Sequence, residues 1–549
     1  MPTGGDLMVD LFIKAGVRHL FGLPGTWTLE FLDALYRSKR MEFYSARHEE
    51  VAIGMADGYA RITGRPAPVI VHGGSGAGNL ARGLMVAYKD CSPVLALICR
   101  DMAYKRGRDT WQEVEISEGL GRFAKWATFV ERTEDLPRII RRAFYEATSG
   151  RPGPVILEIP LDVMTNELRA MPEGETTRPF QVPLFRPRPD PAEVEEARRM
   201  LLEATFPVAL AGGGATWSEA SKVLRQVVEQ LSLPLAVSDS ARGIIPEDHE
   251  SFIGVASRFG YTTTAQALKE ADVILVLGCR LDDLTTVHWT SISPKSRLIQ
   301  VDIMPEEIGR QYPIALGINS DVRAFLEEFL ITLEAPPKRL PWKTRLPLIR
   351  RRLIQEREDY LRKGEVKGAI GFGRIIKEIS PLLSPETVVA GGAGTHTTFA
   401  SKHIYRLPRT WYCSNGLGSM GFSFPALLGV KVAQPNRPTV ALIGDGDFAM
   451  TLQDLETAVR YNLGVKVVVF NDYAYGAMKL IQKMRYSGRY IGVDHDNPDF
   501  GKVARDFGAR GERVAGIREL RPAMERMLKE EGPFVLDVVA KQPPQRLIP

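Results

Sequence analysis

Short, uninterrupted apolar runs recur along the whole chain, and segments of helix length separate them. Clear examples are the runs 93–99, 155–159, 207–211, 273–278, 298–301, 439–443 and 465–470. Several are rich in β-branched residues, and several are followed by glycine. Strands that are apolar on both faces and are joined by helices are typical of parallel sheets covered by helices on both sides. The pattern predicts an α/β fold of doubly wound parallel sheets.

Two polar, proline-rich breaks, at 171–191 and at 335 to about 368, interrupt this pattern. A chain of 549 residues is expected to form about three domains. We therefore expect an N-terminal domain at 1–168, a central domain at 190–334 and a C-terminal domain at 368–549.

The first and third of these domains share a local pattern. In each, an expected helix (50–62 and 424–433) leads through a proline turn into an apolar strand that ends in a glycine-rich loop. Such loops at the carboxyl ends of parallel strands are where ligands usually bind. The pattern indicates two related domains that flank a third.

The composition of the chain indicates what kind of protein it is and which partners are not expected. The chain is 44% hydrophobic and 25% charged, with a formal net charge of only +5. The apolar runs fall far short of the roughly 18 residues that a membrane helix needs, and the four cysteines form no CxxC pair. We therefore expect a soluble, cytoplasmic protein with neither nucleic acid nor a membrane as its partner.

The segment Gly-Asp-Gly-Asp at 444–447 is the most informative motif. It is followed by a helix-length segment and a strand that ends in Phe470-Asn471-Asp472, so that Asp445 and Asp472 are 27 positions apart. That spacing fits a strand, a crossover helix and a return strand, and it predicts both carboxylates at one sheet edge. Two hard oxygen ligands, with Gly446 allowing close backbone approach, suit a Mg²⁺–phosphate site. A solvated turn with a capping aspartate is the alternative that the spacing leaves open.

Five segments, 47–61, 72–79, 150–163, 416–429 and 444–476, together carry a resemblance to a known family. Over nearly its whole length the chain resembles the thiamine-diphosphate enzymes of the acetolactate synthase and benzoylformate decarboxylase group. The resemblance implies pyrimidine-binding, central and diphosphate-binding domains, in that order. The chain departs from the pattern at Asp472, where the family usually has asparagine; aspartate keeps an oxygen ligand and adds a negative charge.

In the third domain the resemblance implies a metal held by the side chains of Asp445 and Asp472 and by the Ala474 carbonyl. The implied cofactor-binding residues there are Thr395, His396, Gly418, Met420, Gly446, Asp447 and Tyr475. Backbone at Thr395, His396, Gly446 and Asp447 would face the diphosphate. The Gly418 carbonyl would accept from the aminopyrimidine, and Met420 would wedge between the cofactor rings. Plain core packing is the alternative for Met420.

In the first domain the resemblance places Glu49 at the pyrimidine N1′, where the family's glutamate promotes formation of the reactive ylid. By itself, an acid at a helix N-terminus is normally a dipole or capping residue. In relatives this domain faces the cofactor-binding domain of a neighbouring subunit. The resemblance therefore implies a homodimer as the minimum unit, with a homotetramer as the expected assembly.

His72 is the residue that discriminates between branches of the family. Acetolactate synthases usually read Thr-Ser-Gly-Pro-Gly where this chain reads His-Gly-Gly-Ser-Gly, whereas benzoylformate decarboxylases carry a histidine that handles protons on substrate atoms. Thr26 matches the small hydroxyl residue of the decarboxylase pocket, but Gln112 resembles a block of acetolactate synthases. The chain also lacks the tryptophan that those synthases have shortly after the position of Gly476. A histidine satisfied by backbone at a strand end is the alternative reading of His72.

The central domain resembles one that holds FAD, or the ADP part of coenzyme A, in some relatives and is empty in others. This likeness is carried by the segments 211–214, 273–278, 280–283 and 300–302, which include Arg280, Asp282, Asp283, Gln300 and Asp302. Glycine after a strand is also ordinary sheet architecture, so these alternatives stay open.

The leading hypothesis is a thiamine-diphosphate- and Mg²⁺-dependent enzyme with a small-molecule substrate. It would decarboxylate a 2-oxo acid as benzoylformate decarboxylase does, or cleave or form a 2-hydroxyketone, through an enamine intermediate. One alternative is an acetolactate-synthase-type carboligase with FAD. Another is a non-catalytic cofactor-binding relative, against which the presence of both Glu49 and Asp445 argues.

Overall fold

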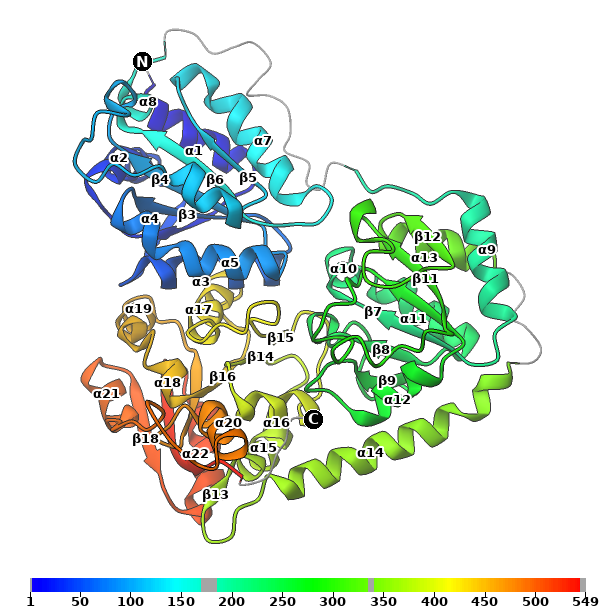
Figure 1. Cartoon of the computed structure of the whole chain (residues 1–549). Helices are drawn as coiled ribbons and strands as arrows, with labels where there is room; N and C mark the ends of the chain where they lie inside the picture. The colour runs from blue at the N-terminus through cyan, green and yellow to red at the C-terminus, as the bar shows by residue number, and fades with distance from the viewer. Residues whose placement is uncertain (1, 169–184, 334–339, 544–549) are drawn as a thin grey trace.

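Three parallel sheets, each with helices on both faces, organise the chain (Figure 1). The computed structural model describes residues 2–168, 185–333 and 340–543. This confirms the expected fold class of three doubly wound α/β domains. The seven strands expected from the apolar runs are all present, as β4, β6, β7, β10, β11, β16 and β17, and their ends differ from expectation by at most one residue.

Alternation along a strand explains why these runs are apolar throughout. In β10 (Val273–Leu277), residues 273, 275 and 277 enter one apolar cluster, and Ile274 and Val276 enter the cluster on the opposite face. Successive side chains of a strand point to opposite faces, so a strand between two helical layers needs apolar residues at every position.

The first domain has the strand order β2-β1-β3-β4-β6-β5. Its strands are β1 (His19–Gly22), β2 (Glu42–Ser45), β3 (Ala67–His72), β4 (Val94–Arg100), β5 (Trp126–Phe129) and β6 (Val155–Pro160). Its helices are α1 (Gly4–Lys14), α2 (Leu29–Ser38), α3 (Glu49–Thr63), α4 (Ser75–Asn79), α5 (Ala81–Lys89), α6 (Ile116–Leu120), α7 (Leu136–Thr148) and α8 (Leu161–Thr165). The expected helix 50–62 is α3.

The central domain has the order β12-β11-β10-β7-β8-β9. Its other strands are β7 (Pro207–Ala211), β8 (Leu235–Val237), β9 (Phe252–Val255), β11 (Arg297–Asp302) and β12 (Leu316–Asn319). Its helices are α9 (Pro191–Leu202), α10 (Gly213–Trp217), α11 (Ser221–Leu231), α12 (Thr262–Glu270) and α13 (Val322–Ile331).

The third domain has the order β13-β19-β17-β16-β14-β15, and β18 also pairs with β19. Its strands are β13 (Ile370–Gly371), β14 (Val388–Gly391), β15 (Trp411–Tyr412), β16 (Thr439–Gly444), β17 (Lys466–Asn471), β18 (Arg510–Val514) and β19 (Phe534–Lys541). Its helices are α15 (Phe372–Ile379), α16 (Thr395–His403), α17 (Ser423–Ala433), α18 (Asp445–Phe448), α19 (Leu455–Arg460), α20 (Gly476–Arg485), α21 (Phe500–Asp506) and α22 (Ile517–Lys529). The expected helix 424–433 is α17.

The segment read from the sequence as a second polar break is largely helical, which corrects that expectation. The helix α14 (Leu346–Lys363) runs between the central and third domains (Figure 1). Trp342, just before it, is 1% exposed and donates a hydrogen bond from its indole nitrogen to the Leu231 carbonyl at 3.0 Å. Apolar anchors on one side of a highly charged helix thus tie it to the central domain. Most of the first break, and residues 334–339 of the second, lie outside the described residues.

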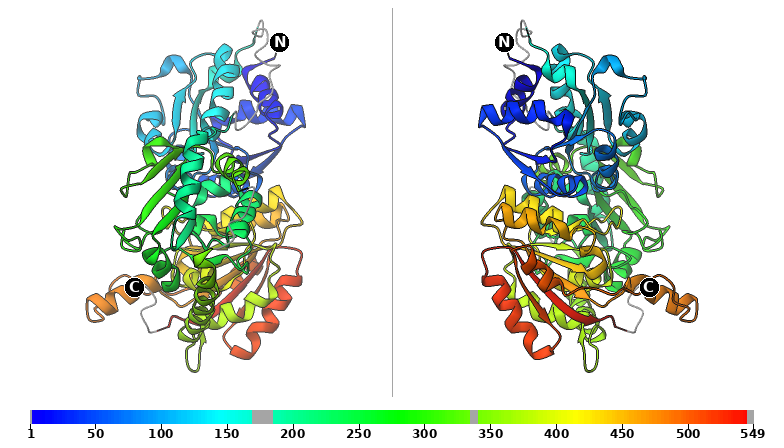
Figure 2. Two further views of the ribbon diagram at one scale, coloured as in Figure 1. Left: turned by 90° about the vertical axis from the view of Figure 1, so that its right-hand side faces the viewer. Right: turned by 90° about the vertical axis from the view of Figure 1, so that its left-hand side faces the viewer.

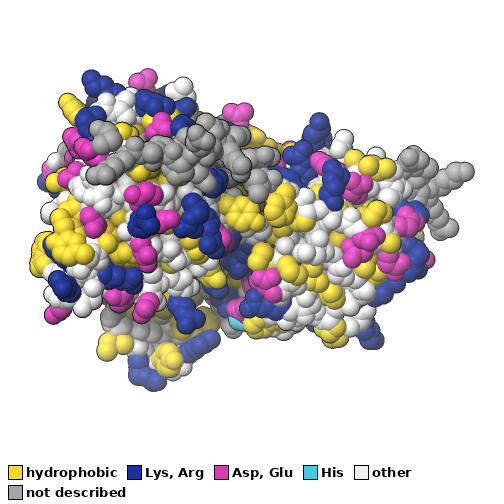
Figure 3. Space-filling view, turned by 90° about the horizontal axis from the view of Figure 1, so that it is seen from above, with side chains coloured by type: hydrophobic (Ala, Val, Ile, Leu, Met, Phe, Trp, Pro, Cys, Tyr) yellow, Lys and Arg dark blue, Asp and Glu magenta, His cyan; other side chains and the backbone are white. Residues whose placement is uncertain are grey.

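The described residues contain no helix that is long and apolar enough to cross a membrane. On the face seen from above, positive and negative side chains are interspersed (Figure 3). That mixture agrees with the small net charge of the chain.

The first domain lies over the third in both side views, and helices α3 and α17 cross at their contact (Figure 2). The crossing is close because glycines line it. A Cβ at Gly58 would lie 1.9 Å from the Ala426 carbonyl oxygen, and one at Gly429 would lie 1.9 Å from the Met55 carbonyl oxygen. One apolar cluster consequently extends from β3 and α3 into α17, β16 and β17.

We predict that Gly58→Ala lowers the midpoint of thermal unfolding, measured by calorimetry. In an isolated helix, alanine is favoured over glycine by about 0.5–1 kcal/mol. A loss of stability would therefore come from the crossing, where overpacking costs about 1–3 kcal/mol. The control is Gly119→Ala in α6, since a Cβ there meets nothing within 4 Å. An unchanged or higher midpoint for Gly58→Ala would contradict the close crossing.

Candidate active site

The two carboxylates expected at one sheet edge are neighbours in the structure. Strands β16 and β17 pair in parallel with Gly444 opposite Phe470, so Asp445 and Asp472 follow the two strands at the same edge. Burial, and then the charge of Asp445, raises the pKa of Asp472 to about 7. Burial likewise raises the pKa of Asp445. Two carboxylates crowded together in this way favour a bound cation.

The surroundings of these carboxylates fit a hard cation. Asp445 accepts from the Gly446 N–H at 2.8 Å and from the side-chain amide of Asn497 at 2.7 Å. Ala474 is buried two residues beyond Asp472. No group of three or more His, Cys, Asp or Glu side chains within the described residues could hold a metal ion. A cation here would therefore need further oxygen ligands, such as the expected Ala474 carbonyl, beside the two carboxylates.

Asp447 has a scaffolding role in the structure. Its carboxylate accepts from the Ala393 N–H at 2.8 Å and from the Gly421 N–H at 2.5 Å. Burial raises its pKa to about 6. The side chain thus joins the loop after β14 and the loop before α17 to the GDGD segment, and it is already engaged with backbone. Its own backbone is the part left for a phosphate.

Thr395 and His396 begin α16, directly after the glycine-rich loop that follows β14. The first N–H groups of a helix lack partners inside the helix and can bind an anion. The His396 ring is buried and stacks on Phe470 with centroids 5.1 Å apart. Burial lowers its pKa to about 3, and its Nε2 is buried without a hydrogen-bond partner. A helix terminus and an unsatisfied imidazole nitrogen together fit a phosphate-bearing ligand.

The remaining third-domain residues gather around Gly446. A Cβ at this position would lie 2.6 Å from the Tyr475 ring and 3.5 Å from the methyl carbon of Met420. Gly418, two residues before Met420, has φ of +68°, a left-handed conformation that favours glycine. The structure therefore brings Met420, Gly446 and Tyr475 together, with Gly418 two residues before Met420, and their roles toward the cofactor stay predictions.

Glu49 is the first residue of α3, and Asn79 donates a hydrogen bond to its carboxylate at 2.9 Å. The same end of α3 meets the third domain of the chain. The Arg47 N–H donates to Asp454 at 2.8 Å. Arg82 pairs with Glu50 and also donates to the Met420 carbonyl. The Glu49 end of α3 and the loop containing Met420 are therefore linked through Arg82. That Glu49 serves a neighbouring subunit stays a prediction.

His72 ends β3, and the structure brings it together with Thr26 and Gln112. The imidazole stacks on Trp27, which follows Thr26, with ring centroids 4.2 Å apart and an interplanar angle of 11°. Its Nδ1 lies 2.9 Å from the Gly73 carbonyl oxygen. Gln112 lies beside Gly74, since a Cβ on that glycine would be 2.7 Å from the Gln112 Cβ.

Four residues that contact or adjoin the expected site residues were not identified from the sequence: Trp27, Arg82, Trp111 and Asn497. Trp27 and Trp111 adjoin Thr26 and Gln112, so adjacency was the available signal. For Arg82 and Asn497 the sequence offers none, because their partners Met420 and Asp445 are distant along the chain.

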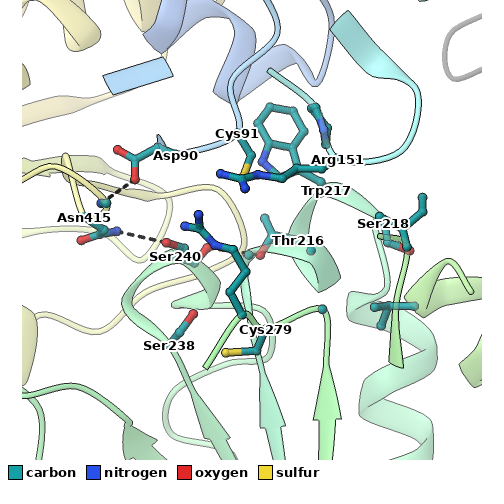
Figure 4. Close-up of a pocket in the computed structure, with 18 of the residues that line it drawn as sticks. Asp90, Cys91, Arg151, Thr216, Trp217, Ser218, Ser238, Ser240, Cys279 and Asn415 are labelled. Carbon is teal, nitrogen blue, oxygen red and sulfur yellow. Dashed lines mark hydrogen bonds between the residues drawn. The ribbon is translucent and has the colours of Figure 1, made fainter. Parts of the chain in front are cut away.

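A separate cavity of about 210 Å³ lies between the three domains (Figure 4). Its lining includes Cys91 and Arg151 of the first domain, Thr216, Trp217, Ser240 and Cys279 of the central domain, and Asn415 of the third. Gly212, Gly214 and Gly278 are packed backbone against backbone, which explains these glycines by sheet architecture. Gly213 instead meets only the Ser240 side chain, the nearest atom 3.1 Å from a built Cβ.

Known protein families show which family this chain belongs to. The chain matches three family models: "Thiamine pyrophosphate enzyme, N-terminal TPP binding domain" at residues 2–118, the central domain of the same family at 194–329, and its "C-terminal TPP binding domain" at 392–538. This chain belongs to the thiamine-pyrophosphate enzymes. Thiamine pyrophosphate is another name for thiamine diphosphate, so the sequence-based prediction of the family and of this cofactor is confirmed.

Individual relatives are similar in sequence to this chain over nearly its full length. The acetolactate synthase large subunit of Haemophilus influenzae is 33% identical over 95% of this chain and 91% of its own length. The isozyme 3 large subunit of acetolactate synthase from Escherichia coli is 32% identical over 96% of this chain and 93% of its own. A probable acetolactate synthase large subunit from Methanocaldococcus jannaschii is 31% identical, covering 98% and 91%.

We predict that Asp445→Ala abolishes Mg²⁺-dependent retention of thiamine diphosphate, because one of the two adjacent carboxylates expected to hold the metal is lost. Equilibrium dialysis of the cofactor with and without Mg²⁺ measures this. Asp506→Ala, at an exposed ion pair with Lys502 in the same domain, is the control and should bind as wild type does. Unchanged Mg²⁺-dependent binding by Asp445→Ala would refute the metal assignment.

Glu49→Gln provides the complementary variant. It should retain the cofactor, because Glu49 lies in the first domain away from the carboxylate pair. It should nevertheless slow hydrogen–deuterium exchange at the cofactor's C2 by orders of magnitude. Exchange at the wild-type rate would show that Glu49 is only a helix-capping residue.

Proposed function

We propose that this chain is a thiamine-diphosphate- and Mg²⁺-dependent carboligase of the acetolactate-synthase type. It would release CO₂ from a 2-oxo acid and join the remaining acyl unit to a second carbonyl compound. The observation that carries the proposal is full-length similarity to three proteins named acetolactate synthase, at 31–33% identity. The relatives thus favour the alternative reading of the sequence over decarboxylation to an aldehyde. Gln112 beside Gly74 is consistent with that reading.

The roles that we propose for individual residues are those that the resemblance implies, and the geometry supports them. Bound thiamine diphosphate would supply the electron sink that decarboxylation of a 2-oxo acid requires. Asp445, Asp472 and the Ala474 carbonyl would hold Mg²⁺. The N-terminus of α16 would bind the diphosphate. Glu49, oriented by Asn79, would hold a proton at the pyrimidine nitrogen.

The assembly belongs to the same proposal. We infer a homodimer as the minimum unit and a homotetramer as the assembly, because the resemblance places the Glu49 domain against a neighbouring subunit. The ligands of this site would be small molecules, a 2-oxo acid and a second carbonyl compound or a 2-hydroxyketone.

A second candidate function is decarboxylation with release of an aldehyde, and His72 is the observation that favours it. A carbonyl oxygen can only accept a hydrogen bond, so Nδ1 donates to Gly73 and carries the ring proton. In this tautomer Nε2 is left to exchange a proton, which is the function of a general acid–base group.

We predict that the wild-type enzyme, supplied with pyruvate and a panel of other 2-oxo acids, forms acyloin-type products in excess over aldehyde. His72→Ala should lower aldehyde release by about 10²–10⁴-fold, the usual contribution of a general acid–base group. Carboligation should persist, because addition to a carbonyl competes with protonation. Product analysis by chromatography, together with CO₂ release, measures both.

The control for that experiment is His288→Ala, since His288 is an exposed residue of the central domain. Wild type that releases aldehyde alone would overturn the carboligase proposal. His72→Ala that releases aldehyde at the wild-type rate would reduce His72 to a packed strand-end residue.

For the cavity between the domains we propose a nucleotide cofactor, FAD in the first instance and the ADP part of coenzyme A as the alternative. Asp302 at the end of β11 and the nearby Glu307 both line the cavity and suit ribose hydroxyls. Burial raises the pKa of Asp302 to about 6, and one Glu307 oxygen is buried without a partner. Arg151 and Arg280 offer positive charge for phosphates, and Trp217 offers an aromatic face.

We predict that heat-denatured protein releases a flavin, identified by its absorbance and by chromatography against adenine nucleotides. Asp302→Ala should lower FAD affinity at least tenfold, because a hydrogen bond to a charged group contributes about 1.5–3 kcal/mol. Glu195→Ala, at an exposed ion pair of α9, is the control. Release of an adenine nucleotide without flavin would favour the ADP part of coenzyme A over FAD. Failure of the reconstituted protein to bind either would overturn the proposal.

A further inference from the structure

Trp27 covers one flat face of the His72 imidazole. The rings are nearly parallel, at 11°, with centroids 4.2 Å apart. Trp27 is 5% exposed, so its indole is fixed within the core of the first domain. Trp111, by contrast, is 68% exposed and meets both rings only edge-on, each at 6.2 Å. The stack with Trp27 is therefore the extensive buried contact of the imidazole.

The turn that carries Trp27 is held by its own hydrogen bonds. Thr28 is fully buried. Its hydroxyl accepts from the Gly25 N–H at 2.8 Å and donates to the Gly25 carbonyl at 2.9 Å. The 3₁₀ turn Thr26–Thr28 is thereby closed on itself. Trp27 consequently has little freedom to follow a movement of His72.

Further contacts restrict the His72 imidazole to one position. A Cβ at Gly25 would lie 2.7 Å from the ring, so glycine is required where the turn passes His72. On the ring edge, Nδ1 bonds to the Gly73 carbonyl. The stack sets the plane of the ring, and this hydrogen bond sets its rotation within that plane. Together they define one orientation and one tautomer.

We propose that Trp27 is a positioning residue that holds His72 in the orientation required for proton transfer at Nε2. The inference rests on the proton-transfer role proposed above for His72. Proton transfer depends steeply on geometry, and a misplacement of about 1 Å can cost about 10²-fold in rate. An imidazole released from the stack can rotate about its side-chain bonds and spends less time in the productive orientation.

The test compares Trp27→Leu, which removes the aromatic face, with Trp27→Phe, which keeps one. Trp27→Leu should lower the kcat for aldehyde release by about 10–100-fold with KM nearly unchanged. Trp27→Phe should recover to within about threefold of wild type. In the His72→Ala background, Trp27→Leu should have no further effect. Trp126→Leu, a tryptophan replacement in β5 of the same domain, is the matched control and should match wild type.

A measurement independent of turnover accompanies the kinetics. In protein labelled at histidine Cε1, the His72 signal is the one of eight that disappears in His72→Ala. Because a ring proton over an indole face is shielded, this signal should move downfield in Trp27→Leu and much less in Trp27→Phe. Thermal unfolding and cofactor affinity establish that each variant is folded.

The outcomes separate the two proposals. Wild-type aldehyde release by Trp27→Leu, or a His72 signal that does not move, overturns the positioning role of Trp27. Wild-type release by His72→Ala overturns the proton-transfer role of His72 itself. The second result comes from the His72→Ala variant and the first from Trp27→Leu, so the two failures are distinguishable.

Discussion

The close crossing of α3 and α17 is the contact on which the rest of the structure depends. Gly58 and Gly429 let the two helices meet at backbone distance, and each would clash there with any side chain. The first and third sheets then share one apolar cluster. Glu49 begins α3, and the loop containing Met420 precedes α17, so the crossing also fixes how these two segments lie relative to each other within one chain. A small change at these glycines would be transmitted to both.

The site concentrates buried negative charge, and the three aspartates are stabilised to different degrees. Asp447 is satisfied by two backbone N–H groups, and Asp445 by one N–H and the Asn497 amide. Asp472 has Asp445 as a like-charged neighbour, and its pKa is raised furthest, to about 7. A buried carboxylate whose charge is only partly compensated by its neighbours is typical of functional sites. It lies where the chain departs from the asparagine expected from the resemblance, so the departure bears directly on the end of the site that is proposed to hold the metal.

Much of the fold could be predicted because its strands are long and apolar on both faces. β7 was placed to the residue, whereas two-residue strands such as β13 and β15 carry too little pattern to be recognised. The helix α14 was missed for a different reason. Its composition is that of a solvated segment, and only its docking on the central domain through Trp342 and a few apolar residues makes it a stable helix. The expected domain boundaries and the individual roles of the site residues stay predictions.

The sequence by itself determined the parallel α/β architecture, the family, and the position of Asp445 and Asp472 at one sheet edge. The architecture and the shared edge follow from local periodicity and from the short reach of a strand–helix–strand unit, and the family follows from the resemblance that the five motif segments carry. Only the tertiary structure decided that Trp27 stacks on His72, and that Arg82 joins Glu50 to the Met420 carbonyl, a partner 338 positions away. The physical reason is that such contacts depend on how completed sheets and helices pack against one another, and local sequence pattern carries no record of that packing.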